Sequence, residues 1–234
     1  MTEVIVALDV DTITKEEELL ERLKGTITYY KVGLRLFTAH GKRAVDLVHR
    51  HGGKVFLDLK MLDIPQTVAD AVREAQRLGV YSVSIHLWGG AEMVKAAAAV
   101  HPRPKLWGVS VLTSLTNEDL KFFHPSAQVK TMVTRLARMG KANGIDGIVC
   151  SAQEVAGLRK SLGPETCFVT PGIRPAGADT HDQRRVMSPA DAARLGIRFA
   201  VIGRPITKSA APHKAALDIL TEMRRASPRA LESA

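Results

Sequence analysis

The chain has 234 residues, of which 45% are hydrophobic and 24% are charged. This length suits a single α/β domain with a large core, and the composition is ordinary for a globular protein. No stretch approaches the roughly 20 apolar residues needed to cross a bilayer. The amino-terminal run is strand-like rather than a basic leader before an apolar segment, so we expect a cytoplasmic protein without membrane contact.

The net charge of +9 invites the hypothesis of a nucleic-acid partner, because basic proteins attract phosphate. The basic residues are scattered along the chain, with only modest clusters at Arg184-Arg185 and Arg224-Arg225. The sequence has no arginine-rich tail and no interleaving of aromatic with basic residues. We therefore expect no nucleic-acid partner. The two cysteines imply no disulfide framework.

Short apolar runs alternate with longer amphipathic stretches from end to end. The runs are rich in Val, Ile, Leu and Phe and do not alternate strictly with polar residues, which is typical of parallel strands buried on both faces. We predict eight strands: VIVALD (4–9), TYYKVG (28–33), KVFLDLK (54–60), SVSIHL (82–87), LWGVSVLT (106–113), GIVCS (147–151), CFVTPG (167–172) and FAVIG (199–203).

Helical patterns fill the intervals between these strands. Thr14 followed by Glu17 resembles a capping box, residues 34–51 read as one helix, and Pro65 suits a helix start. Further helices are expected over 91–100, 126–142 and 152–162. Eight strand-then-helix units predict one (β/α)8 barrel spanning residues 1–234, with a frayed tail from about residue 226.

One connection, between residues 170 and 188, is long and rich in Gly, Pro and polar residues. A loop of this length in a compact domain is usually functional and often a lid.

The active site of such a barrel forms at the carboxyl ends of its strands. Asp58 and Lys60, two apart on a strand, point the same way; Asp63 follows close behind and adds a second carboxylate. Such a cluster is costly unless a ligand or a reaction uses it; the alternative is a salt-bridge network that caps the barrel. Other polar residues at strand ends are Asp9, Lys31, His86, Thr113, Ser151, Arg174, Gly203 and Arg204.

The eighth strand ends in Gly203 and Arg204 before a helix start at Pro205. Backbone N–H groups and a guanidinium make a phosphate site, which Arg174 and Gln183 of the long loop could close. The alternative is an exposed arginine beside a solvated loop. His86 reads as a hydrogen-bonded structural residue and both tryptophans as packing residues. No metal-binding motif is present.

The sequence DLKMLDIPQTV carries the pattern D-x-K-x-x-D-I-P-x-T and resembles the orotidine 5′-phosphate decarboxylase family. Further segments of the family's pattern follow in order across residues 4 to about 207. Ser188 stands where threonine is often expected, and Leu87-Trp88 is bulkier than usual. The other matching segments are ALDV, YYKVGLRLF, VLTS, TPGIRP, GADTHDQRRVMSP and VIGRPIT.

The resemblance implies decarboxylation of orotidine 5′-monophosphate to uridine 5′-monophosphate, the last step of de novo UMP synthesis, without a cofactor. It implies that Lys60 protonates C6 and that Asp58 lies beside the substrate carboxylate. Asp63 and Thr67 would reach the neighbouring site of a homodimer. The remaining implied contacts are Asp9 and Lys31 at the ribose, Thr113 at the pyrimidine, and Arg174, Gln183, Gly203 and Arg204 around substrate and phosphate.

Two other functions stay open at this point. One is a metal-dependent sugar-phosphate decarboxylase or synthase of the same barrel group, which would not be expected to carry the I-P-x-T extension or the DQRRV loop. The other is a non-catalytic nucleotide-binding or scaffold protein on a retained barrel. Loss of Lys60 or Asp58 would favour the second, and both residues are present.

Overall fold

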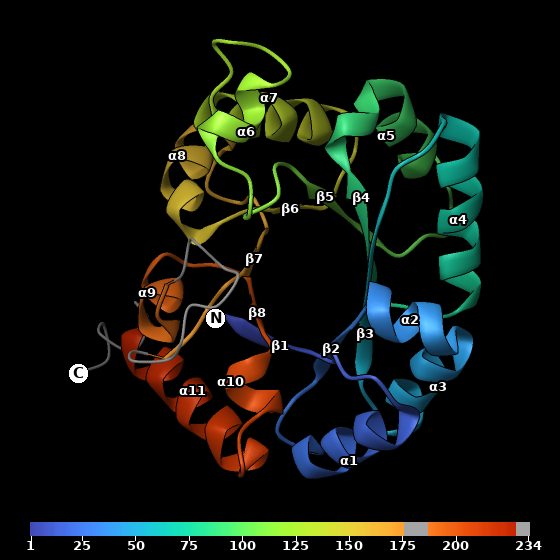
Figure 1. Cartoon of the computed structure of the whole chain (residues 1–234), viewed down its shortest axis with the longest axis vertical. Coiled ribbons are helices and arrows are strands. Elements are labelled where there is room, and N and C mark those ends of the chain that lie inside the picture. Colours follow the sequence, from blue (N-terminus) through green and yellow to red (C-terminus); the bar gives the residue numbers. More distant parts are fainter. Residues whose placement is uncertain (176–186, 228–234) are drawn as a thin grey trace.

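Eight parallel strands close into a barrel in chain order, and the helices form a ring around them (Figure 1). This computed structural model describes residues 1–175 and 187–227. The predicted (β/α)8 fold is confirmed. The strands are β1 (Glu3–Ala7), β2 (Tyr29–Gly33), β3 (Lys54–Met61), β4 (Ser82–His86), β5 (Lys105–Val109), β6 (Gly147–Val149), β7 (Phe168–Pro171) and β8 (Phe199–Ile202).

Eleven α-helices and one short 3-10 helix occur in the described part of the chain. They are α1 (Ile13–Leu23), α2 (Leu34–His40), α3 (Lys42–Arg50), α4 (Pro65–Arg77), η1 (Leu87–Gly89), α5 (Gly90–Ala98), α6 (Asn117–Lys121), α7 (Val129–Ala142), α8 (Ala152–Leu162), α9 (Pro189–Arg194), α10 (Arg204–Thr207) and α11 (Pro212–Ala226). None of them is both long enough and apolar enough to span a membrane.

The twofold alternation of each strand decides which side chains enter the barrel. On β1, Val4 and Val6 pack outward among the helix-facing core, whereas Ile5 and Ala7 pack inside. On β3, Phe56 belongs to the interior cluster and Val55 to the outer one. Asp58 lies at the next inward position on β3, and Asp9 lies two residues after Ala7, just past the end of β1. The period of two therefore delivers these carboxylates to the barrel mouth.

An aromatic layer fills the barrel interior below the mouth. Trp107 is 1% exposed, and its ring centroid lies 4.5 Å from that of Phe56 and 5.0 Å from that of Phe199. Tyr29 packs edge-on against Phe199 with 5.2 Å between centroids. This layer makes the barrel a packed core rather than a pore, as expected of the fold. It confirms Trp107 as a packing residue.

Three predicted details of the helices are wrong. The first helix is capped by Thr12, whose Oγ accepts from the Lys15 N–H at 3.2 Å, and not by Thr14. The stretch 34–51 is two helices, because Gly41 adopts a φ of 53° and ends α2 before α3 begins. The helix expected over 126–142 begins at Val129, and a separate short helix, α6, precedes it.

At the end of the chain, α11 extends to Ala226, which is buried. The rest of the expected frayed tail, from residue 228, lies outside the described residues.

Glu16 is a buried acid on the core-facing side of α1. It is fully buried, it shares that face with Leu19, Leu20 and Leu23, and neither carboxylate oxygen accepts a hydrogen bond from the described residues. Burial raises the pKa of Glu16 to about 8, against a smaller opposing effect of the Arg50 charge. In the unfolded chain the same carboxyl titrates near 4.5.

The folded state thus binds this proton more tightly than the unfolded state. The protonated carboxyl therefore contributes to the free energy of unfolding. This contribution is complete below about pH 4.5 and is lost as the pH rises toward 8. The glutamine of Glu16→Gln has no proton to lose. The free energy of unfolding of the variant, relative to the parent, should therefore be higher at pH 7.5 than at pH 4.5, by on the order of 3 kcal/mol. Urea unfolding at both pH values measures the change, with the exposed neighbour substituted as Glu17→Gln for the control. Parallel pH dependences of Glu16→Gln and the parent would refute the prediction.

Candidate active site

A cavity of about 810 Å³ opens at the carboxyl ends of the strands. The structure brings together eight of the eleven residues that the sequence predicts for the site. These residues line the cavity: Asp9, Lys31, Asp58, Lys60, Thr113, Arg174, Gly203 and Arg204. Asp63 and Thr67 are not among its lining residues, and Gln183 lies outside the described residues.

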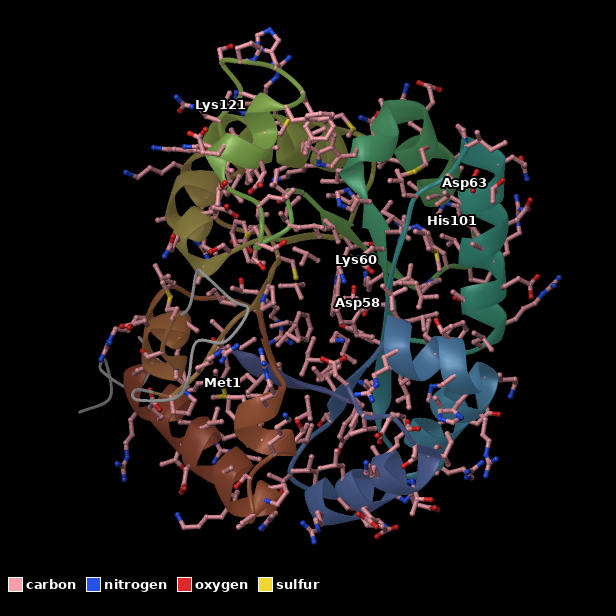
Figure 2. All side chains as sticks on the ribbon, in the orientation of Figure 1. Met1, Asp58, Lys60, Asp63, His101 and Lys121 are labelled. Carbon is pink, nitrogen blue, oxygen red and sulfur yellow. The ribbon has the colours of Figure 1, made fainter. Side chains whose placement is uncertain are left out.

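A chain of alternating charges runs across the ends of β1, β2 and β3. Lys31 Nζ lies 2.8 Å from Asp9 Oδ1 and 3.8 Å from Asp58 Oδ2. Lys60 Nζ lies 3.0 Å from Asp58 Oδ1 and 2.9 Å from Asp58 Oδ2. Figure 2 shows Asp58 and Lys60 side by side toward the middle of the barrel. The four charged groups, which the sequence places at the ends of three strands, thus lie together at one mouth of the barrel.

Asp58 is the most electrostatically constrained member of this chain. Its side chain is only 12% exposed. Burial opposes its ionisation, but the charges of Lys31 and Lys60, with hydrogen bonds from Lys60 and Ser84, outweigh burial and lower the pKa of Asp58. The carboxylate is therefore ionised at neutral pH and holds a permanent negative charge beside Lys60, whose side chain is 33% exposed to the cavity.

Ser84 is a residue of this cluster that the sequence analysis missed. Its Oγ donates to Asp58 Oδ1 at 2.8 Å and accepts from the backbone N–H of Lys60 at 2.8 Å. The available signal was the spacing of Ser82, Ser84 and His86, which gives one face of β4 three polar side chains. A period of two on a neighbouring strand points that face into the barrel.

The ends of β7 and β8 supply a second group of cations. Arg174 is only 8% exposed, and its backbone N–H donates to the Met187 carbonyl at 2.9 Å. That bond and the Ile173–Met187 bridge join the two described ends of the long connection. Gly203, which has no side chain, follows β8 directly, and Arg204 begins α10 after it. Both arginines line the cavity.

Asp63 and Thr67 lie away from the cavity of their own chain. Both are exposed. Asp63 Oδ1 accepts the Ile64 N–H at 2.6 Å, and Figure 2 shows Asp63 beside α4, apart from Lys60 and Asp58. Asp63 therefore does not contribute a second carboxylate to the Lys60 of its own chain in this structure.

His86 and Trp88 adjoin the site at the end of β4. The Trp88 N–H donates to His86 Nδ1 at 3.5 Å, and burial together with the charge of Lys60 lowers the pKa of His86. The Trp88 indole N–H donates to the Ser110 carbonyl at 3.0 Å. The bond to His86 suits the hydrogen-bonded structural role predicted for that residue. Trp88, which the sequence predicts to be a packing residue, is 37% exposed and packs only partly. Within residues 1–175 and 187–227, no group of three or more His, Cys, Asp or Glu side chains is placed to hold a metal ion.

Residues 2–219 match the model of a protein family described as "Orotidine 5′-phosphate decarboxylase / HUMPS family". The chain belongs to the orotidine 5′-phosphate decarboxylase family. An orotidine 5′-phosphate decarboxylase of Laribacter hongkongensis is 49% identical over 217 residues, which are 91% of this chain and 89% of the relative. A relative of the same name from Moorella thermoacetica is 45% identical over 230 residues, which are 94% and 91% of the two chains.

The fold of this family member also matches solved structures. The crystal structure of the orotidine 5′-phosphate decarboxylase of Lactobacillus acidophilus superposes with a TM-score of 0.84 at 35% identity, covering 95% of this chain and 99% of that one. An uncharacterized conserved protein of Geobacillus kaustophilus gives a TM-score of 0.81 at 32% identity, covering 94% and 99%. The relatives from Laribacter hongkongensis and Moorella thermoacetica both carry the decarboxylase name, and neither supports the sugar-phosphate alternative.

Proposed function

We propose that this chain decarboxylates orotidine 5′-monophosphate to uridine 5′-monophosphate and carbon dioxide, as the last step of UMP synthesis in the cytoplasm. The Lys60 ammonium lies within 3.0 Å of the ionised Asp58 at the mouth of the cavity, and this pair supports the proposed function most directly. Family membership and the names of relatives that are 45–49% identical point to the same substrate.

The charge of the cavity suits this substrate. At neutral pH the nucleotide carries one carboxylate and a phosphate with a charge of about −1.5 to −2. Cationic side chains outnumber anionic ones in the cavity lining by seven to three. The cationic residues are Lys15, Lys31, Arg35, Lys60, Arg174, Arg204 and Lys208, and the anionic ones are Asp9, Asp11 and Asp58.

The order of the strands suggests how the nucleotide lies. Two strands, β1 and β2, separate β8 from β3 around the barrel. We place the phosphate at Gly203, Arg204 and Arg174, and the ribose hydroxyls over Asp9 and Lys31. The pyrimidine then lies over Lys60 and Asp58, beside Thr113. This arrangement assigns one part of the substrate to each section of the cavity wall.

The chemistry follows from where negative charge develops. Breaking the C6–carboxylate bond releases carbon dioxide and leaves the electron pair on C6, where the pyrimidine offers no good route to delocalise it. A fixed ammonium at Lys60 stabilises that developing charge electrostatically. Its proton then moves to C6 and completes the uridine ring. The proposal assigns the reaction no cofactor.

Asp58 and the residues that bind the phosphate act together in this mechanism. Asp58 keeps Lys60 charged and oriented, and it faces the substrate's own carboxylate. Because like charges repel, holding the two carboxylates together requires binding energy from elsewhere. The remote phosphate contacts at Arg204 and Arg174 supply that energy.

We further propose that the working unit is a homodimer in which Asp63 and Thr67 serve the neighbouring site. Asp63 lies outside its own cavity, and the residues on either side of it, Leu62 and Ile64, expose 54% and 67% of their surfaces. Exposed apolar side chains grouped around a functional residue are typical of a protein–protein interface. A second copy covering this surface would bring its Asp63 toward a Lys60 ammonium.

The ultraviolet absorbance of orotidine 5′-monophosphate mixed with the purified protein and a chelator tests the proposal. We expect the absorbance band of the substrate to be replaced by that of the uridine nucleotide, at the same rate with the chelator as without it. Binding without conversion would identify a non-catalytic nucleotide-binding protein. Conversion that the chelator abolishes would favour the metal-dependent alternative.

Arg204→Ala separates phosphate binding from chemistry. We expect it to lower kcat/KM for the nucleotide by about 100-fold or more, which is about 2.7 kcal/mol of transition-state stabilisation. It should scarcely affect turnover of the phosphate-free nucleoside, which lacks the group that Arg204 grips. Steady-state kinetics on both substrates give the comparison. Equal losses on the two substrates would assign Arg204 a structural role instead.

A further inference from the structure

Ser84 lies behind the reactive pair and not in the cavity. It is fully buried on β4, which pairs with β3 on one side and β5 on the other. It is not among the residues that line the cavity. A substrate in the cavity therefore meets Asp58 and Lys60 and does not meet Ser84.

The hydroxyl of Ser84 fixes the backbone of Lys60. Lys60 has a φ of 50° and, among the described residues, is the only one other than glycine with a positive φ. The register of β3 against β4 shifts between Leu57 and Met61, so the regular ladder of the two strands is interrupted where Lys60 lies. In this segment the Lys60 N–H donates to Ser84 Oγ at 2.8 Å. A side-chain hydroxyl thus holds a backbone conformation that a lysine rarely adopts.

The same hydroxyl fixes the rotation of the Asp58 carboxylate. A serine hydroxyl can donate one hydrogen bond while it accepts another, and here it donates to Asp58 Oδ1 at 2.8 Å. With Oδ1 held from β4, Oδ2 faces Lys60 at 2.9 Å and Lys31 at 3.8 Å. Ser84 Oγ, one buried atom, therefore fixes both the backbone of Lys60 and the carboxylate of Asp58 that orients the Lys60 ammonium.

We infer that Ser84 is a positioning residue for the decarboxylation, acting through Asp58 and Lys60 without touching the substrate. The inference rests on the proposed function of those two residues. Misplacement of a catalytic group by about 1 Å can cost on the order of 100-fold in rate. Removing the hydroxyl should therefore lower kcat by about 100-fold and leave KM within about threefold.

The chain provides a matched control two residues away. Ser82 lies on the same strand and the same inward face, and it is equally buried. Its Oγ has no hydrogen-bond partner among the described residues. Ser82→Ala thus removes the same atoms from the same environment without breaking a bond to the site, and Ser84→Thr keeps the hydroxyl.

The experiment compares Ser84→Ala, Ser84→Thr and Ser82→Ala with the parent protein in kcat, KM and thermal unfolding. We expect Ser84→Ala to lose about 100-fold in kcat, Ser84→Thr to recover most of that loss, and Ser82→Ala to keep the parental kcat.

The acid limb of the pH profile of kcat gives a second measurement. The groups around Asp58 are Lys31 on β2, Lys60 on β3 and Ser84 on β4, with His86 near Lys60. Loss of the Ser84 bond should shift that limb to higher pH, because the ionised form of Asp58 loses a donor.

Several results would overturn the inference. A Ser84→Ala protein with kcat within threefold of the parent would do so. Equal losses in Ser84→Ala and Ser82→Ala, or a loss that follows only the unfolded fraction, would show that Ser84 is structural. Lys60→Ala separates this failure from failure of the proposed function. If Lys60→Ala is inactive while Ser84→Ala is fully active, only the role of Ser84 is wrong. If Lys60→Ala is also active, the proposed function of Lys60 itself is wrong.

Discussion

Replacing Lys60 by alanine should lower kcat for orotidine 5′-monophosphate by at least about a thousandfold while the protein stays folded. The substitution removes both the positive charge that stabilises the C6 carbanion and the proton that quenches it. Each effect alone is commonly worth two or more orders of magnitude. Lys60 lies at the edge of the cavity with its side chain one-third exposed, so its loss leaves no hole in the apolar core.

Steady-state rates of absorbance change, with circular dichroism for folding, measure the effect. Lys54→Ala is the matched control, because Lys54 begins the same strand at the opposite end of the barrel. Its ammonium lies over the Tyr29 ring, 5.5 Å from the centroid. We expect Lys54→Ala to keep its kcat. A Lys60→Ala protein with activity within about tenfold of the parent, roughly 1.4 kcal/mol of barrier, would remove Lys60 from the mechanism.

Mixing two inactive variants should restore activity if each site is built from two chains. Lys60→Ala and Asp63→Ala are each expected to be nearly inactive as homodimers. After equal mixing and exchange of subunits, half the dimers are hybrids. In a hybrid, one site carries both defects, and the other takes an intact Lys60 from one chain and an intact Asp63 from its partner. A twofold symmetric dimer therefore predicts recovery of about a quarter of the wild-type sites.

Lys60→Ala mixed with Asp58→Ala is the matched control for this experiment. Asp58 contacts the Lys60 of its own chain, so each site of that hybrid keeps one defect and no activity should return. Native mass spectrometry establishes that subunits have exchanged. Exchange without recovery in the Lys60→Ala and Asp63→Ala mixture would mean that Asp63 serves its own chain and that the shared site is wrong.

The barrel and the charged cluster could be predicted because both depend on short-range periodicity. Eight apolar runs separated by helical patterns predict the strands, and a spacing of two predicts that Asp58 and Lys60 share one side of β3. The two side chains do meet, although the strand is irregular at Lys60. The ends of neighbouring parallel strands then bring Asp9 and Lys31 to the same edge. None of these steps needs knowledge of a contact between distant segments.

The errors arise where two local signals compete or where a contact crosses between elements. Thr12 and Thr14 are both capable caps, and the glutamate three residues after Thr14 favoured the wrong one. Gly41 interrupts an amphipathic pattern that continues across it, and only its φ of 53° separates α2 from α3. Glu16 is the first of three consecutive glutamates, and its spacing from Leu19 and Leu20 places it on the buried face of α1.

Ser84 shows the limit of reading each strand separately. Its importance comes from two bonds to a different strand, at a point where the register of β3 and β4 shifts. No pattern within β4 indicates that shift. The sequence therefore predicts the charged groups of the site, whereas the structure is needed to identify what holds them in place.

Orotidine 5′-monophosphate labelled at its carboxyl carbon shows whether the protein releases that carbon as carbon dioxide. The purified protein is incubated with the labelled nucleotide and a chelator, and carbon dioxide and the remaining nucleotide are quantified together. We expect one labelled carbon dioxide and one uridine 5′-monophosphate for each substrate molecule consumed. Consumption of the substrate without matching release of labelled carbon dioxide, or no consumption by a folded protein, would contradict the proposed function.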